Sequence, residues 1–186
     1  MSSSIDLSYP AVQKLFAQHL VPGRTESRAF LAWFLENYYR LDEFDAQDAI
    51  CDGTDDKGVD AIYVYDNLEA IDIFQCKLFQ NNSKTLGESS LRDFIGTLSQ
   101  FQTATFIEMI EGNTTNVELA GLLREQKVAE KVRQGYSVRG VFLTNVIGDQ
   151  STRQYLAGHA NVQLFDAPEL QKLYVSPLPS RPQLTL

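Results

Sequence analysis

The chain has 186 residues, of which 44% are hydrophobic, so it is long enough for one domain with an apolar core. Its formal net charge of −8 argues against a protein that coats nucleic acid, because such proteins draw most of their affinity from Lys and Arg. No apolar stretch approaches the roughly 20 residues that span a bilayer, and no basic region followed by an apolar one opens the chain. We therefore expect a soluble cytoplasmic protein.

Two helices are predicted before the first strand. The triplet Ser8-Tyr9-Pro10 resembles a helix start and predicts a short helix that ends near Leu20. Thr25 is expected to cap a second, largely buried helix from Glu26 to about Tyr39. Helical geometry turns Glu26 toward the core side of this second helix. A first-turn carboxylate can simply stabilise the helix dipole, or it can bind a ligand, and both interpretations stay open at this point.

The segment that follows contains the most informative pattern of the chain. Residues 48–52 predict a first core strand, after which Asp55 and Asp56 are expected in a loop. Two runs rich in Ile, Val, Tyr and Phe, Val59–Tyr65 and Ala70–Lys77, then predict a β-hairpin closed by residues 66–69. In this register, Tyr65 lies opposite Ala70.

The same register predicts a polar group at the open end of the hairpin. Side chains alternate faces, so Asp60 lies opposite Gln75, and Lys77 follows on the same face, across from Gly58. A carboxylate, an amide oxygen and an ammonium group suit phosphodiester hydrolysis with Mg²⁺, which prefers oxygen ligands and keeps several waters. The alternative is an ordinary strand end that faces the surface.

Later elements are predicted from hydrophobic periodicity and turn residues. After a polar loop over residues 78–87, we expect a long helix over 88–111, a second helix over 117–134 and a strand over 138–144. A short helix over 151–157, a strand over 162–165 and a final helical turn over 168–174 follow. Residues 176–186 are proline-rich and predict a linker.

Charge and cysteine placement add two expectations. Cys51 and Cys76 are predicted to be reduced and buried, with Cys76 turned away from the face of Gln75 and Lys77. A basic cluster is expected to contact a nucleic-acid backbone, although a solvated surface is equally compatible with it: Arg124, Lys127, Lys131, Arg133 and Arg139.

The order Gly58-Val59-Asp60, a hairpin turn and then Ile-x-x-Phe-Gln75-Cys-Lys77 resembles the PD-(D/E)xK nuclease superfamily in its Q-x-K variant. It is most similar to Mrr-type restriction endonucleases and to the N-terminal region of abortive-infection phage-resistance (AIPR) proteins. The resemblance covers roughly residues 24–175. Two departures from the pattern are Val59 in place of proline and Gln75 in place of a carboxylate, and the second removes one anionic ligand.

The resemblance implies an α/β fold of restriction-endonuclease-like type, with an αβββαβ core and a mixed sheet flanked by helices. It implies Asp60 as the metal-binding carboxylate, Gln75 at the usual acidic position, Lys77 as the catalytic lysine and Glu26 as the ligand that completes the site. Mg²⁺, replaceable by Mn²⁺, is the implied cofactor.

The implied activity is hydrolysis of nucleic acid, with DNA favoured, in antiviral defence. Restriction-type nucleases often act as homodimers. The domain boundaries expected are an N-terminal helical appendage over 1–23, the nuclease-like domain over 24–175 and a tail over 176–186, with a larger C-terminal region in the intact protein. The alternative function is a catalytically inactive module of the same fold that senses nucleic acid or docks a protein.

Overall fold

One mixed sheet forms the centre of the computed structural model, which describes residues 5–51 and 53–175. In this part of the chain the sheet has four strands in the order β1-β2-β3-β4. The strands are β1 (Ala61–Tyr65), β2 (Ala70–Lys77), β3 (Ser137–Thr144) and β4 (Val162–Phe165). β1 and β2 are antiparallel, whereas β3 and β4 continue the sheet in parallel. The predicted α/β class with a mixed sheet flanked by helices is confirmed.

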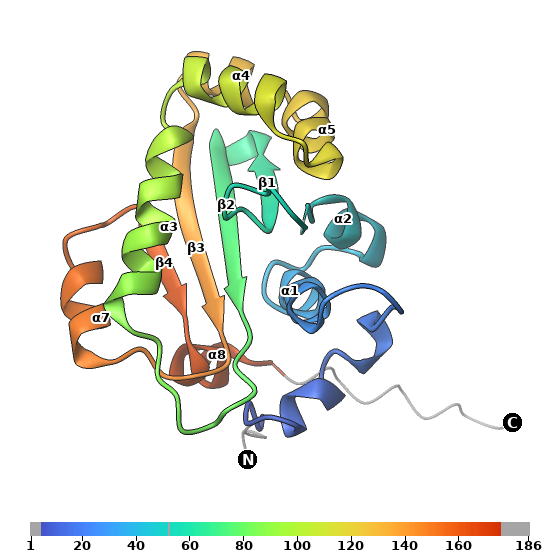
Figure 1. Ribbon diagram of the computed structural model, residues 1–186, viewed down its shortest axis with the longest axis vertical. Coiled ribbons are helices and arrows are strands. Elements are labelled where there is room, and N and C mark those ends of the chain that lie inside the picture. Colours follow the sequence, from blue (N-terminus) through green and yellow to red (C-terminus); the bar gives the residue numbers. More distant parts are fainter. Residues whose placement is uncertain (1–4, 52, 176–186) are drawn as a thin grey trace, which may run out of the picture.

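Helices cover both faces of this sheet (Figure 1). α1 (Glu26–Asn37) and α2 (Glu43–Asp48) lie on one side, and α3 (Glu88–Gln100) lies on the other. The alternation of strand side chains divides the core accordingly: Ile71 and Ile73 pack with α3, and Phe74 packs with α1. β3 is buried on both faces over its second half, as predicted.

The helix predicted from Ser8 to Leu20 is replaced by two short 3-10 turns, η1 (Ala11–Lys14) and η2 (Ala17–His19). Val12 and Phe16 are fully buried, and the Phe16 ring lies 5.9 Å from the Phe30 ring of α1. The residues before α1 therefore share its core. The predicted start of α1 is confirmed, because the Thr25 side chain accepts a hydrogen bond from the backbone of Arg28.

The strand predicted over residues 48–52 is wrong. α2 occupies the chain as far as Asp48, capped by the side chain of Asp42, and pairing with β1 is reduced to one bridge between Ile50 and Ala61. The apolar run was read correctly as buried, but the polar helix signal before it takes up the residues that a full strand would need. Asp52 lies outside the described residues.

Both long helices predicted after β2 are interrupted. The first divides into α3 and α4 (Ala104–Asn113), and the break lies beside Phe101, whose side chain is fully buried. The second divides into α5 (Val117–Glu125) and α6 (Val128–Arg133), separated by Lys127 with a left-handed φ of 52°. Each break changes the direction of the chain, so that short apolar faces on four helices reach one core.

The remaining elements agree with expectation within one or two residues: η3 (Asp66–Leu68) in the hairpin turn, α7 (Gln150–Leu156) and α8 (Ala167–Leu173). Both cysteines are free thiols, and burial raises the pKa of the Cys51 thiol well above its usual value. The predicted linker over 176–186 lies outside the described residues.

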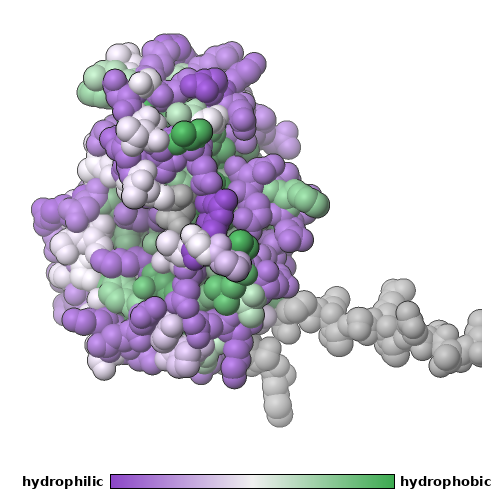
Figure 2. All heavy atoms as spheres, turned by 45° about the vertical axis from the view of Figure 1, so that its right-hand side comes forward, coloured by the Kyte–Doolittle hydropathy of each residue, from purple (hydrophilic) through white to green (hydrophobic). Residues whose placement is uncertain are grey.

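The surface carries apolar side chains singly rather than in one broad patch on the face seen in Figure 2, where hydrophilic residues predominate. Phe44 and Val117 are the most exposed large apolar residues, at 80% and 84%. In the part of the chain that the structure describes, no helix combines the length and the apolar character needed to cross a membrane.

Candidate functional site

The open end of the β1–β2 hairpin brings Asp60, Gln75 and Lys77 together. Ala61 pairs with Phe74 and Tyr65 pairs with Ala70, which is the predicted register, so Asp60 lies opposite Gln75. All three polar residues line one hollow of about 300 Å³ on the α3 side of the sheet. The hollow is lined by Asp56, Gly58, Asp60, Gln75, Cys76, Lys77, Ser90, Asp93 and Phe142.

Asp60 is held rigidly at the edge of this hollow. Its Oδ2 accepts a hydrogen bond of 2.6 Å from the backbone N–H of Cys76, between Gln75 and Lys77. Its own backbone N–H donates to the carbonyl of Phe74 at 2.8 Å. Because a charged acceptor forms a strong hydrogen bond, the carboxylate is fixed relative to the strand that carries the other two groups.

Lys77 ends β2 with an exposed side chain. Its ammonium group donates a hydrogen bond of 3.1 Å to the Ser90 hydroxyl and lies 5.3 Å from the centre of the Phe79 ring. The ammonium group is therefore near the surface of the hollow, where it can approach an anionic ligand. Cys76 points to the opposite face, with its Sγ 3.5 Å from the carbonyl of Ser27, as predicted.

Gly58 leaves space beside Gln75. Its φ is +75°, and a Cβ at this position would lie 3.2 Å from the Thr97 hydroxyl and 3.5 Å from the amide nitrogen of Gln75. The adjoining loop is tied down by Asp55, which has a φ of +58° and whose carboxylate accepts hydrogen bonds from Thr115. A side chain in place of Gly58 would thus narrow the entrance to the hollow.

Two further carboxylates line the hollow, and the sequence gave each a different weight. Asp56 was expected in the loop with only a minor chance of reaching a metal, and its Oδ1 accepts a hydrogen bond from Gly58 N at 2.8 Å. Asp93 on α3 was not predicted at all. A usable signal was present, since Ser90, Asp93 and Thr97 interrupt the apolar stripe of α3 at helical spacing.

Glu26 does not line this hollow. It lies in the first turn of α1, where its carboxylate accepts hydrogen bonds from Gln13 at 2.5 Å, from Tyr9 at 3.4 Å and from Gln80 at 3.2 Å. The helical angle indicated correctly that Glu26 turns inward. It did not indicate which group of inward-facing residues it meets.

The predicted nucleic-acid-binding residues lie at the other end of the hairpin. Lys131 forms an ion pair of 2.7 Å with Asp66 in the β1–β2 turn, and Figure 1 shows α4 and α5 at this end of the sheet. Arg124 pairs with Glu111 at 3.1 Å, and Arg133 pairs with Glu108. Lys127 lies beside them in the same shallow hollow. The structure therefore does not bring this basic cluster to the candidate site.

Oxygen donors are present for a divalent cation, but they are not gathered into a dense cluster. Within residues 5–51 and 53–175, no three His, Cys, Asp or Glu side chains are grouped closely enough to hold a metal ion. Mg²⁺ commonly binds through one or two carboxylates and keeps several waters, so Asp60 with the Gln75 amide oxygen fits this sparse mode of coordination.

Comparisons with protein-family models, with curated proteins and with solved structures gave no match.

Proposed function

We propose that the protein is a metal-dependent nuclease that hydrolyses phosphodiester bonds of nucleic acid, with DNA as the favoured substrate and cytoplasmic antiphage defence as its setting. The observation that carries the proposal is the joint position of Asp60, Gln75 and Lys77 in one hollow. A carboxylate, an amide oxygen and an ammonium group are suited to a cation-assisted displacement at phosphorus.

The order of elements supports a restriction-endonuclease-like core. If the single bridge at Ile50 is counted as a reduced first strand, α1 is followed by that bridge, β1, β2, a helical segment and β3. This order corresponds to the αβββαβ arrangement that the sequence resemblance implies. The antiparallel hairpin followed by a parallel strand is compatible with the same arrangement.

In this proposal Asp60 is the principal cation ligand and Gln75 provides a neutral oxygen. Asp56 or Asp93 supplies the second carboxylate, because both line the hollow and Glu26 does not. When bound, the cation supplies positive charge to the phosphodiester and makes water a better nucleophile. Phe142 is buried and forms an apolar wall beside Gln75, its partner across the sheet.

Lys77 acts on the reacting phosphate. A water oxygen adds to phosphorus, the bond from phosphorus to the leaving oxygen breaks, and the leaving oxygen takes up a proton. Negative charge grows on the phosphoryl oxygens during this step, and the Lys77 ammonium group stabilises it. Gly58 leaves room for the substrate backbone to approach.

The test is cleavage of single-stranded and duplex DNA and RNA with Mg²⁺ or Mn²⁺ by the wild type, Asp60→Asn and Lys77→Met. We expect each variant to lose at least about 10²-fold in rate, since charge-stabilising groups have effects of this size. Lys84→Met is the matched control, because Lys84 is exposed in the loop after β2. Folded variants that cut as fast as the wild type would defeat the proposal.

The second candidate is a catalytically inactive module of the same fold. It is favoured by the amide at position 75 and by the lack, in the described part of the chain, of a three-residue group of metal-binding side chains. It predicts metal-independent binding of nucleic acid that is unchanged by Asp60→Asn.

A further inference from the structure

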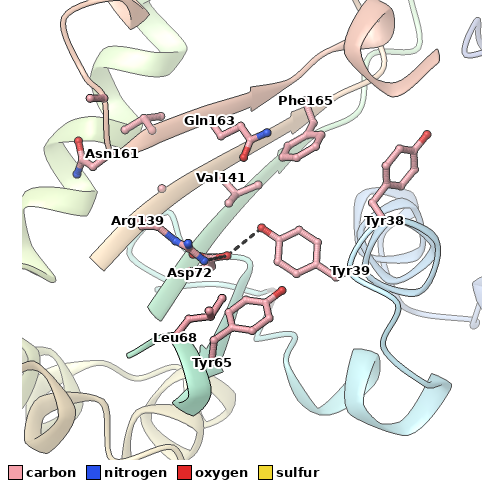
Figure 3. A pocket seen from close by; sticks show the side chains of 13 residues that line it. Tyr38, Tyr39, Tyr65, Leu68, Asp72, Arg139, Val141, Asn161, Gln163 and Phe165 are labelled. Atoms are coloured by element: carbon pink, nitrogen blue, oxygen red, sulfur yellow. Dashed lines mark hydrogen bonds and ion pairs between the residues drawn. The ribbon is translucent and has the colours of Figure 1, made fainter. Parts of the chain in front are cut away.

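A second and larger hollow lies on the face of the sheet opposite to the candidate active site. It has a volume of about 380 Å³ and forms where β2, β3 and β4 extend beyond the C-terminal end of α1 (Figure 3). Asp72 of β2 lies at its base, and alternation along the strand turns Asp72 to the other side from Gln75. The two hollows are therefore separated by the sheet itself.

A buried carboxylate fixes a guanidinium group in the wall of this hollow. Asp72 is 2% exposed, and its two oxygens accept hydrogen bonds from Arg139 Nε at 2.6 Å and Nη2 at 3.0 Å. Tyr39 donates a third hydrogen bond of 2.9 Å to Asp72, shown dashed in Figure 3. A buried ion pair contributes little net stability, so its main effect is to hold the guanidinium plane in one orientation.

Aromatic rings form the adjoining wall and their positions are also fixed. Tyr39 is held by Asp72, and the Tyr38 hydroxyl donates to the carbonyl of Leu170 at 2.8 Å. Tyr65 lies 6.0 Å from Tyr39, and the Arg139 guanidinium lies 5.7 Å from the Tyr65 ring centre. Phe165 closes the floor. Rigid, half-exposed rings of this kind offer faces on which a flat ligand can stack.

Unused hydrogen-bonding groups lie across the hollow from these rings. Figure 3 shows Asn161 and Gln163 on the side away from Tyr65, with Arg139 between them. Both amide side chains are exposed, and neither has a hydrogen-bond partner among residues 5–51 and 53–175. Arg139 Nη1 also has no partner there, because Asp72 uses only Nε and Nη2. Donors and acceptors therefore converge on a space bounded by aromatic rings.

We propose that this hollow binds a purine ring. Amide side chains match the paired donor and acceptor atoms on a purine edge, a guanidinium N–H matches its ring nitrogen or carbonyl acceptors, and the tyrosines accept the ring face. The purine belongs either to a free nucleotide or to an unpaired base of a single strand, which share this chemistry. The site does not depend on hydrolysis at the opposite face.

Calorimetry on the full chain in metal-free buffer tests the proposal, because no strand is then cleaved during the titration. The probes are AMP, GMP and a short single strand of deoxyadenylate, with ribose 5-phosphate and an abasic strand of equal length as base-free counterparts. We expect binding of at least one purine probe, and Gln163→Leu is expected to weaken it about tenfold, the effect of losing one good base contact. Gln102→Leu, an exposed glutamine outside the hollow, is the matched control and should bind like the wild type.

Binding of the monophosphates assigns the hollow to free nucleotides, and binding of the strand alone assigns it to unpaired bases. The proposal is overturned if no purine probe binds at about millimolar concentration, if the base-free counterparts bind equally well, or if Gln163→Leu binds like the wild type. Thermal unfolding of Gln163→Leu verifies that the variant is folded. Loss of cleavage in Asp60→Asn with unchanged purine binding would separate this site from the proposed nuclease.

Discussion

The hydrogen bond from Cys76 N to Asp60 Oδ2 connects the two strands of the hairpin at the point where the polar side chains meet. A carboxylate held in this way pays little further entropy to bind a ligand, because its rotamer is already restricted. Gln75 and Lys77 flank the donor residue on the same strand. The geometry of these three residues thus depends on a single backbone contact and on the hairpin register.

The identity of the second carboxylate can be tested at the scale of single residues. We expect Asp93→Asn to weaken Mn²⁺ binding by at least the roughly tenfold effect typical of groups around a metal, because Asp93 lines the hollow with Asp60. Glu26→Gln is expected to leave the affinity near that of the wild type, since Glu26 is engaged by Gln13 and Gln80. Isothermal calorimetry measures both.

Asp56→Asn belongs in the same series, because Asp56 also lines the hollow. The reverse ranking, with Glu26→Gln abolishing Mn²⁺ binding and both aspartate variants binding normally, would restore the ligand set that the sequence resemblance implies. It would also mean that α1 and the hairpin approach each other when the cation binds.

At the scale of elements, close packing of α3 on β3 depends on Gly140. A Cβ at this position would lie 2.8 Å from a Leu98 methyl carbon and 2.9 Å from the Phe94 ring. These distances are shorter than real carbon contacts, so the helix and the strand would have to move apart. A residue without a side chain at this point lets α3 lie directly on the sheet and carry Asp93 over the hairpin.

We expect Gly140→Ala to lower the free energy of unfolding by about 1–3 kcal/mol, the usual cost of overpacking a core. Gly96→Ala, in the middle of α3, is the matched control, because a Cβ there meets no atom within 4 Å. It should be neutral or stabilising by up to about 1 kcal/mol. Chemical denaturation measures both, and a Gly140→Ala protein as stable as the wild type would contradict the packing argument.

The loop before β1 predicts a pH dependence. Its Asp55 carboxylate bonds to Lys57 and to Thr115, and these contacts hold the pKa of Asp55 well below its usual value. A lowered folded-state pKa gives stability that is present above the unfolded pKa of about 3.9 and is lost as the pH falls toward the folded value. The loop should therefore loosen only in acid.

Denaturation of the wild type and Asp55→Asn between about pH 5 and pH 2 measures this contribution. The wild type should be the more stable protein at the upper end, and the difference should shrink as the pH falls. Asp45→Asn is the control, since Asp45 is exposed on α2 and its carboxylate has no hydrogen-bond partner among the described residues. A difference that stays constant with pH would exclude the predicted linkage.

At the scale of the whole molecule, acidic and basic groups are distributed unevenly along the hairpin axis. Carboxylates line the candidate site at the open end, whereas the basic cluster of α5 and α6 lies beside the turn. Several of these basic side chains pair with Glu108, Glu111 and Asp66, which reduces the charge available to a phosphate backbone. A strand bound at the open end would need to follow the protein surface to reach them.

If a nucleic-acid strand does reach this cluster, a double change of Arg124 and Lys127 to Gln should weaken binding and lower the salt slope by about 0.9 per lost phosphate contact on duplex DNA. Fluorescence anisotropy over a range of salt concentrations measures the slope. Lys14→Gln and Lys172→Gln together give a control with the same change in net charge. An unchanged slope in the Arg124 and Lys127 variant would remove these residues from the binding surface.

The sequence by itself determined the hairpin, its register and the meeting of Asp60, Gln75 and Lys77. These features depend on a two-residue alternation and on a short turn, which are local properties of the chain. It also located the start of α1, the strands β3 and β4 and the outward turn of Cys76 from the polar face, for the same reason.

Only the tertiary structure decided which further residues join the site. Asp93 reaches it because α3 crosses the hairpin, and Asp56 reaches it because Asp55 fastens the preceding loop to the start of α5. The same long-range packing divided the predicted long helices, reduced the first strand to the Ile50 bridge and engaged Glu26 elsewhere. Periodicity shows that a side chain faces inward, but contacts between distant segments decide what it meets.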